Sequence, residues 1–529
     1  LVTQLIERRI AAGDVGRGQS LDTNWDVIRH AVIEAASEFA PALATRLRRV
    51  RGGRWEPWWN KATKLLRDKR IAVAKLLVAA RAAGEDTSQL AARYRQAQHA
   101  VSKSSRLAYA AFWESRNSKL REYASDPQKS KVFWDVVLQR LAGDTKRAVE
   151  LAVPAGGFTS DASEVAGIFA ENDEKLGRDD PPAGNTFDMT ARARQDAQVR
   201  DILAKPIVRG RGGHDVTVGE ILRLIARMQY GKSPGRDFVS TDLLKLLAKG
   251  VDDGGSTAFF DTLRMLFNMC LEQGQVPSDW SVAMVKVLYK KGDRSDWRNY
   301  RLISLLSVVS KLFEAVLAAR LSAYLDESGG LSPFQCGFRA KRRCQHRSFV
   351  LAEAIKSNAR RGKRTYAAFL DVRKAYPTMR RAAMLARLYD KLGDGQTRCR
   401  VWTVIGRMLR EENCLSRVVV DGAESDEYAV GHGVREGAVL SPVLYAVFID
   451  GIVRRLAACR GVAVGGVQVR ALLYADDVVL LATTPDDLRA QLAARRRRAP
   501  TSRHLHSVFM HNLSIADLIT AQGEVPAPG

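Results

Sequence analysis

Two short apolar runs late in the chain, residues 472–474 and 478–481, flank a pair of adjacent carboxylates, Asp476 and Asp477. Each run has the length and composition of a buried β-strand. Because a buried carboxylate without a partner is costly, the acids are expected at the tip of a hairpin rather than within its strands. The pattern predicts a turn that presents two acids to a shared divalent cation, although a solvated turn rich in aspartate fits the same residues.

A third acid follows another β-prone run, residues 365–370, which ends at Asp371. An Asp at a strand end also fits a cap for the following helix. Two strands with acids at their ends can form one oxygen-rich site, which suits Mg²⁺, with Mn²⁺ as the alternative. Asp371, Asp476 and Asp477 are therefore the candidate catalytic residues and metal ligands. Two ions held in this way support phosphoryl transfer, the chemistry of a polymerase.

The same reading of apolar spacing predicts the other elements. Helices are expected at residues 258–271, 307–325 and 384–392, and a strand at 282–288 leads into a turn at 290–293. Residues before about 145 read as helical and basic. Residues 152–213 are rich in Gly, Pro, Asp and Ala, which predicts a linker containing a short helix.

The formal net charge is +25, from 83 Lys and Arg against 58 Asp and Glu over 529 residues. This excess favours a polyanionic partner, and nucleic acid fits it best once the three acids are considered. The six cysteines include no CxxC pair, so free thiols are expected rather than a zinc site or a disulfide framework. No apolar run approaches the roughly 20 residues of a membrane span, so no membrane partner is expected. The first residue is Leu rather than Met, which suggests a fragment of a longer reading frame.

The segments that hold the acids resemble motifs A, B and C of reverse transcriptases: residues 369–376, 433–442 and 474–477. More closely, they resemble those of LINE-type (non-LTR) retrotransposons. Residues 299–306 and 335–339 resemble that family's fingers motifs, and residues 231–237 resemble a motif nearer its N-terminus. The resemblance keeps the family's order from about residue 218 to 488, and the ordered set is much more specific than any single motif.

The resemblance implies a right-hand α+β fold, with an antiparallel palm sheet backed by helices and a fingers region before it. It places fingers and palm at residues 216–490 (core 271–490), after a basic helical region at 1–150 and a linker at 151–215. Residues 491–529 form an atypical basic tail that begins with four arginines at 495–498. No further palm motif or helical thumb is visible there, so we expect a truncated or frame-shifted end.

The resemblance also gives roles to residues near the expected nucleotide. Tyr376 matches an aromatic wall that excludes a 2′-hydroxyl, which favours dNTP over rNTP, although simple packing would also suit it. Gly437 matches a glycine under the nascent base pair, where a missing Cβ lets the backbone approach the substrate. Glu436 replaces the usual Gln, and its charge beside a triphosphate requires a nearby base, for which Arg435 is a candidate.

Three basic residues match the fingers positions that hold the incoming triphosphate: Lys290, Lys291 and Arg301. Charge-assisted contacts of this kind orient phosphates and stabilise charge in the transition state. A basic hairpin that grips the template backbone is an equal alternative for the two lysines.

The sequence therefore predicts the RNA-directed DNA polymerase of a non-LTR retrotransposon, which transfers dNTP to a primer 3′-hydroxyl with two metal ions. Its partners would be an RNA template, a DNA primer and dNTP, and the resemblance implies a ribonucleoprotein of nucleus and cytoplasm. The alternatives are a catalytically impaired nucleic-acid-binding remnant of such an element and an RNA polymerase that copies RNA. Oligomeric state does not follow from the sequence.

Overall fold

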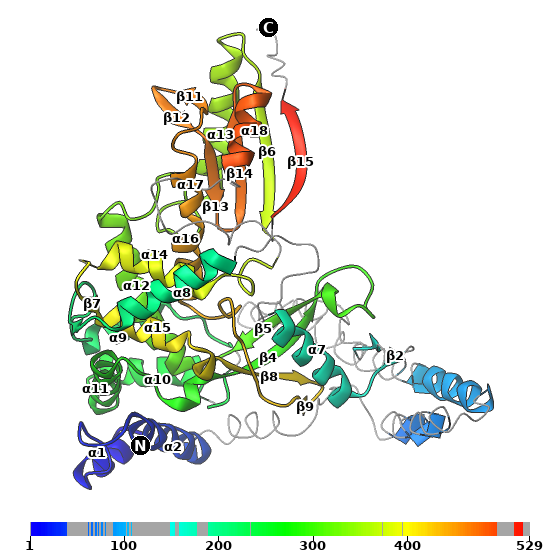
Figure 1. Ribbon diagram of the computed structural model, residues 1–529. Coiled ribbons are helices and arrows are strands. Elements are labelled where there is room, and N and C mark those ends of the chain that lie inside the picture. Colours follow the sequence, from blue (N-terminus) through cyan, green and yellow to red (C-terminus); the bar gives the residue numbers. More distant parts are fainter. Residues whose placement is uncertain are drawn as a thin grey trace, which may run out of the picture. The chain divides into compact units, whose positions relative to one another are not determined.

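The computed structural model describes residues 2–39, parts of 62–107, 149–153, 158–176, 189–494 without residues 233, 238, 373 and 394, and the backbone of 513–521. The chain divides into two compact units, residues 1–44 with 150–529, and residues 45–149. In the second unit the described residues 88–101 are helical. The first unit mixes helices and sheets, and the following paragraphs concern it (Figure 1).

A four-stranded antiparallel sheet contains the acid-bearing segments. Its strand order is β13 (Ala471–Tyr474), β14 (Asp477–Ala482), β6 (Thr365–Val372) and β15 (Leu513–Ala521). Alternate side chains pack on opposite faces, as the two-residue period of a strand requires. Ala367 and Leu472 join a small cluster with Ala354 of α13 (Cys344–Ala359), whereas Leu370 and Leu480 join the main core. The sheet is therefore covered on both faces.

A second sheet of five strands lies earlier in the fold. Its order is β10 (Tyr428–Ala429), β8 (Leu415–Val420), β4 (Val282–Tyr289) and β5 (Tyr300–Leu305), with β9 (Ala423–Glu424) paired to β8. Helix α7 (Ala162–Leu176) packs on β8, β9 and β10. The Phe169 ring meets the Tyr300 ring edge-on, with 5.2 Å between centroids. The residues for which a linker is predicted thus contain a helix that covers this sheet.

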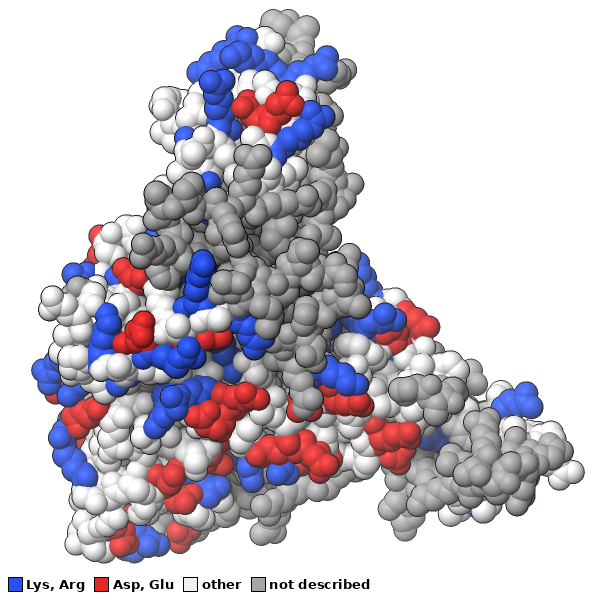
Figure 2. Space-filling view, in the orientation of Figure 1, with Lys and Arg blue, Asp and Glu red and all other residues white. Residues whose placement is uncertain are grey.

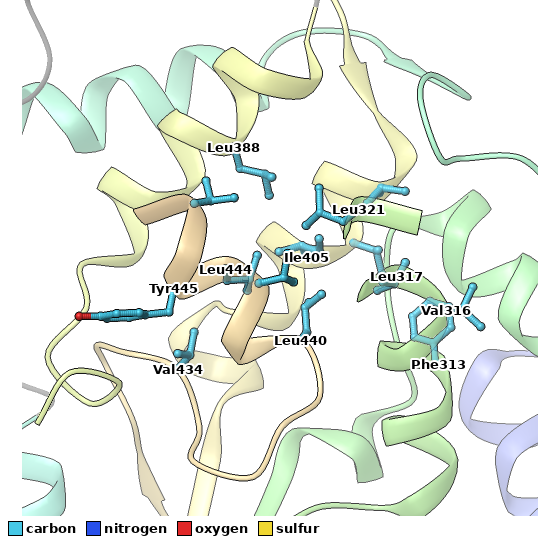
Figure 3. Close-up of a cluster of buried hydrophobic side chains, with 14 of the residues drawn as sticks. Phe313, Val316, Leu317, Leu321, Leu388, Ile405, Val434, Leu440, Leu444 and Tyr445 are labelled. Carbon is cyan, nitrogen blue, oxygen red and sulfur yellow. The ribbon is translucent and has the colours of Figure 1, made fainter. Parts of the chain in front are cut away.

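Between the sheets lies a helical core, drawn in Figure 3. It is built from the helices α8 (Met189–Leu203), α9 (Val218–Arg227), α10 (Thr241–Asp252), α11 (Ala258–Gln273), α12 (Val308–Glu327), α14 (Arg381–Leu392), α15 (Arg400–Met408), α16 (Ser441–Ile449) and α17 (Gly451–Arg455). Leu317, Leu388, Ile405 and Leu444 come from four different helices and are all at most 1% exposed. Their burial joins segments far apart in the sequence into one hydrophobic core.

Two N-terminal helices, α1 (Val2–Ala11) and α2 (Leu21–Phe39), pack on α11. Trp25 is 1% exposed, donates from its indole N–H to Asp279 at 3.1 Å, and meets the Trp280 ring edge-on. Residues near the start of the chain therefore belong to the same core as the two sheets.

Helix α18 (Pro485–Ala494) packs on β14 and β6. The remaining short elements are β1 (Leu151–Ala152), β2 (Phe158–Thr159), β3 (Ile207–Val208), β7 (Arg398–Cys399), β11 (Val462–Val464), β12 (Val467–Val469) and the 3₁₀ turns η2 (Ser278–Ser281), η3 (Trp297–Asn299) and η4 (Glu411–Asn413). The six cysteines, all among the described residues, are free thiols. Within the described parts of the chain, no helix has the length and apolar character needed to cross a membrane.

The predicted helices and strands of this unit are confirmed, with ends that move by a few residues. The strand predicted at 282–288 is β4, the run at 365–370 is β6, and the runs beside the paired acids are β13 and β14. The three predicted helices are α11, α12 and α14. Each of these segments has an apolar pattern strong enough to fix its type from local sequence alone.

Candidate active site

The paired acids lie at a tight hairpin turn between β13 and β14. Tyr474 pairs with Asp477, so Ala475 and Asp476 form the two-residue turn. Ala475 has a left-handed φ of 59°, which is uncommon for a residue with a Cβ. Asp476 is half-buried and Asp477 is exposed, whereas Leu473 and Val478 beside them are buried. The predicted hairpin with acids at its tip is confirmed.

The third acid is brought to this turn by the register of the central strand. Leu370 of β6 pairs with Val478 of β14, so the next residues along the two antiparallel strands, Asp371 and Asp477, come opposite each other. Opposite residues on neighbouring strands have Cα atoms about 4.5–5.5 Å apart. The side chain of Asp371 lies outside the described part of the structure, and the remaining described side chains form no cluster of three metal-ligating groups. The backbone places the three acids together, and their metal ligation remains a prediction.

The segment 335–337 holds the turn from the side. The Cys336 N–H donates to the Leu473 carbonyl at 3.0 Å, and the Leu473 N–H donates to the Phe334 carbonyl at 2.9 Å. A Cβ at Gly337 would lie 2.1 Å from the backbone nitrogen of Ala475, so only glycine allows this approach. Gln335 is fully buried, and its side-chain oxygen accepts from the Gly337 N–H at 2.8 Å. These contacts position the turn, a role that the sequence analysis did not assign.

Tyr376 lies close to both the turn and Glu436. Burial, followed by the nearby Asp476 and Glu436 carboxylates, raises the pKa of the Tyr376 hydroxyl to about 12. Its ring packs against that of Tyr445, with 5.3 Å between centroids and 42° between planes. Tyr445 is one of the core residues drawn in Figure 3. One edge of the Tyr376 ring is therefore fixed by the core while the residue still interacts with the acids.

Glu436 lies among charges of both signs. Burial is the largest cause that raises the pKa of its carboxyl, and the Asp173 and Asp476 carboxylates raise it further. Arg301 and Lys290 act in the opposite direction. The expected counter-charge thus comes from these two residues rather than from Arg435.

Arg435 turns away from that position and joins two strands. Its guanidinium donates to the Leu415 carbonyl at 2.8 Å and to the Ser281 carbonyl. It therefore ties β8 to the start of β4, which corrects the expectation that it lies beside Glu436 as a counter-charge. Lys291 is exposed, and no described interaction joins it to the group around Glu436.

Gly437 brings the backbone against a strand. It has a φ of 117°, and a Cβ there would lie 2.5 Å from the Ser304 carbonyl oxygen of β5. The neighbouring Glu436 carbonyl accepts from the Ser304 N–H at 2.7 Å. In the described structure, Gly437 lets the backbone approach β5, and its predicted approach to the substrate stays a prediction. The helix that follows, α16, begins only at Ser441.

Glu314 of α12 positions the next part of this loop. It is 4% exposed, and its carboxylate accepts from the backbone N–H groups of Val439 and Leu440 at 2.7 and 3.1 Å. Burial is the main cause that raises the pKa of this carboxyl, against the lowering effect of the two N–H donors. Its signal in the sequence is a carboxylate that stands between apolar residues in the first half of α12.

Asp173 of α7 also belongs to this group, although nothing in the sequence singles it out. Its carboxylate accepts from the Tyr428 hydroxyl at 2.8 Å, and burial raises its pKa. The ammonium group of Lys374, which also lies near Glu436, lowers the pKa of Asp173. The positions that the structure brings together are Lys290, Arg301, Tyr376, Glu436 and Asp476, with Asp371 and Asp477 placed by register.

Basic and acidic side chains are interspersed on the face drawn in Figure 2.

Comparisons with known proteins show which proteins this chain is similar to. Residues 289–503 match the sequence model of the family described as reverse transcriptase (RNA-dependent DNA polymerase). The RNA-directed DNA polymerase from the mobile element jockey of Drosophila melanogaster is 25% identical over 372 residues, 70% of this chain and 38% of the relative. A retrovirus-related Pol polyprotein from a type-1 retrotransposable element of Nasonia vitripennis is 29% identical over 252 residues, which are 47% of this chain and 24% of the relative. A probable RNA-directed DNA polymerase from transposon BS of Drosophila melanogaster is 26% identical over 338 residues, which are 63% of this chain and 34% of the relative.

These matches show that the chain is similar to RNA-directed DNA polymerases of mobile elements. Residues 289–503 are similar in sequence to the reverse transcriptase family, and the resemblance to non-LTR retrotransposon polymerases that the sequence predicts is confirmed. The family match includes the three acids and continues past residue 488, whereas the motif at 231–237 lies before it. The chain spans 38%, 24% and 34% of the lengths of the three relatives.

Proposed function

We propose that the chain is an RNA-directed DNA polymerase that adds dNTP to a primer 3′-hydroxyl, as part of a non-LTR retrotransposon. The observation that carries the proposal is the register of β6 and β14, which brings Asp371 opposite Asp477 beside the turn that holds Asp476. On this proposal the four-stranded sheet is the palm, and the five-stranded sheet belongs to the fingers.

The turn fits divalent metal ions by its chemistry. Carboxylate oxygens are ligands that Mg²⁺ prefers, and three carboxylates at adjacent strand ends would hold two ions, with Mn²⁺ as the alternative. Asp476 and Asp477 lie at the tip of an apolar hairpin, where water, substrate phosphates and ions can reach them. When bound, such a pair supplies charge stabilisation at the attacking and leaving oxygens of phosphoryl transfer.

The chain's own residues would bind and orient the nucleotide. Arg301 and Lys290 lie near Glu436 and supply positive charge for the triphosphate. Tyr376, held by its contact with Tyr445, offers a ring face at which a 2′-hydroxyl would be excluded. The primer 3′-hydroxyl would attack the α-phosphate, and pyrophosphate would leave towards the basic residues.

The partners follow from this reaction. An RNA template and a DNA primer would bind near the turn, and the net charge of +25 predicts binding that weakens strongly with salt. The family resemblance further implies a ribonucleoprotein that acts in the nucleus and cytoplasm.

Primer extension tests the proposal. The whole chain is incubated with an RNA template, a DNA primer, Mg²⁺ and dNTP, and compared with the double variant Asp476→Asn plus Asp477→Asn. The matched control is Asp486→Asn, which removes one carboxylate from an exposed pair with Arg489 on α18. Extension by the wild type and the control, and its loss in the double variant, is the expected result. Undiminished extension by the double variant would overturn the assignment of these acids.

The same assay addresses the alternative of an impaired nucleic-acid-binding remnant. Tight RNA binding by the wild type without incorporation of any nucleotide would replace the polymerase proposal with that alternative. Preference for rNTP over dNTP would instead support an RNA polymerase.

A further inference from the structure

A cavity of about 310 Å³ lies between the segment that follows α12 and helix α17, and none of the predicted site residues lines it. Its lining includes an aromatic ring, small apolar side chains and charged groups, among them Ser332, Phe334, Asp450, Arg454 and Arg470. Its volume is at the lower end of the range of small-molecule sites.

The one carboxylate in this lining already has partners. Asp450 is 2% exposed and accepts from the Ser332 N–H at 2.7 Å. Its other oxygen lies 3.5 Å from the Lys391 ammonium, which also donates to the carbonyl of Gly330 in the cavity wall. The negative charge of Asp450 is therefore balanced from within the fold.

The two guanidinium groups in the lining retain donor capacity. Arg470 donates to the Cys459 carbonyl at 2.5 Å and to the Gln468 carbonyl at 3.5 Å, which uses two of its five N–H groups. Arg454 is exposed, and among the described residues its guanidinium has no hydrogen-bond or ion-pair partner. Both groups are available to an anion that enters the cavity.

Further positive charge lies near Arg454 and Asp450. Burial, with repulsion from Arg455 and Arg454, lowers the pKa of Arg387 to about 9, and burial lowers that of Arg455 to about 10. The carboxylates that act on Arg387 in the opposite direction are those of Asp450 and Asp390. The cations around this cavity therefore outnumber the nearby carboxylates, and an anion would relieve their mutual repulsion.

We propose that this cavity binds a phosphate monoester, with Arg454 and Arg470 as its ligands. A phosphate group carries up to two negative charges and several acceptor oxygens. It therefore suits a site with two guanidinium groups better than a ligand with a single carboxylate would. The Phe334 ring and the neighbouring Val453 offer an apolar face for an attached base. A free nucleoside monophosphate and the 5′-phosphate end of a nucleic-acid strand share this chemistry.

Calorimetric titration of the whole chain in the presence of a chelator tests the proposal without requiring polymerase activity. The probes are inorganic phosphate, adenosine monophosphate, and a short RNA with or without a 5′-phosphate. Arg454→Gln and Arg470→Gln are each expected to weaken binding of the phosphate monoester at least tenfold. Arg489→Gln, at an exposed arginine that pairs with Asp486, is the matched control and is expected to leave it unchanged.

The outcomes separate this site from the proposed polymerase site. The double variant Lys290→Gln plus Lys291→Gln should leave monophosphate binding unchanged, because those lysines lie elsewhere. Stronger binding of adenosine monophosphate than of the phosphorylated RNA indicates a free nucleotide as the ligand, and the reverse order indicates a strand end. Three results would overturn the proposal. They are no saturable binding of any probe, binding by the Arg454 and Arg470 variants as tight as by the wild type, and a loss in the lysine variant as large as in the arginine variants.

Discussion

The close contact between Gly437 and β5 makes Gly437→Ala a sharp test of how the loop before α16 is built. The φ of 117° lies in a region that L-residues rarely adopt, and the added methyl carbon would lie 2.5 Å from the Ser304 carbonyl oxygen. Either the loop keeps its path under strain, or it moves away from β5 and loses the hydrogen bond between the Ser304 N–H and the Glu436 carbonyl. Both routes cost stability.

The magnitude follows from these two costs. A residue held in such a backbone region costs about 1–3 kcal/mol. If the loop moves, the lost hydrogen bond between Ser304 and Glu436 costs about 1–2 kcal/mol. If the loop stays, crowding of the new methyl group against β5 costs about the same. We therefore expect a destabilisation of about 2–5 kcal/mol, together with weaker dNTP binding, because Glu436 and its basic neighbours would move with the loop.

Urea unfolding followed by tryptophan fluorescence measures the first effect, and KM for dNTP in primer extension measures the second. Gly219→Ala is the matched control, because Gly219 lies in α9 with no atom within 4 Å of an added Cβ. Alanine in a helix is favoured over glycine by about 0.5–1 kcal/mol, so this variant should be neutral or more stable. An unfolding midpoint for Gly437→Ala equal to that of the control would refute the close contact with β5.

Three further predictions concern the site and its support. Tyr376→Ala should reduce discrimination against rNTP by about tenfold or more, because a side chain that excludes the 2′-hydroxyl contributes at least about 1.4 kcal/mol. The ratio of kcat/KM for dNTP to kcat/KM for rNTP measures this discrimination. An unchanged ratio would mean that Tyr376 only packs against the core. Glu436→Gln should lower KM for dNTP, and the difference in KM between variant and wild type should widen as pH rises. Burial raises the pKa of Glu436, so its repulsive negative charge develops only as pH increases. A difference in KM that narrows with rising pH would contradict this. Burial raises the pKa of Asp237 to about 7, so the wild type should lose stability from about pH 4 to pH 7 relative to Asp237→Asn. The amide oxygen of the variant can still accept a hydrogen bond from the Ser307 hydroxyl. Melting temperatures of the two proteins that run parallel across this pH range would contradict the burial of the charge.

Elements close to the paired acids could be predicted because their information is local. The apolar runs that become β4, β6, β13 and β14 each have a strand's length and end at turn residues or acids. Helices α11, α12 and α14 likewise follow from apolar spacing. The meeting of Asp371 with the turn was predicted from acids at the ends of two strands, and the register of β6 and β14 gives it a structural basis.

Contacts that depend on distant segments could not be predicted in this way. The Gly, Pro and Asp content of residues 151–215 indicates a linker, yet α7 and α8 within it pack on β8 and on α14. Gln335 and Gly337 read as part of a motif, but their contact with Ala475 arises only when segments about 140 residues apart come together. Glu314 is visible as an odd residue on an apolar helix, whereas its two backbone partners are not.

Position 436 shows why a residue type alone does not define the chemistry of a site. From the sequence, a glutamate where glutamine is usual implies repulsion of the triphosphate, with Arg435 as the expected remedy. In the structure Arg435 is committed to the Leu415 and Ser281 carbonyls, while burial and Asp173 of α7 raise the pKa of Glu436. A protonated glutamate has one donor and one acceptor at its tip, as a glutamine amide has. Burial and the Asp173 and Asp476 carboxylates favour this form, whereas Arg301 and Lys290 favour the charged form, so the fold around position 436 decides which charge the triphosphate meets.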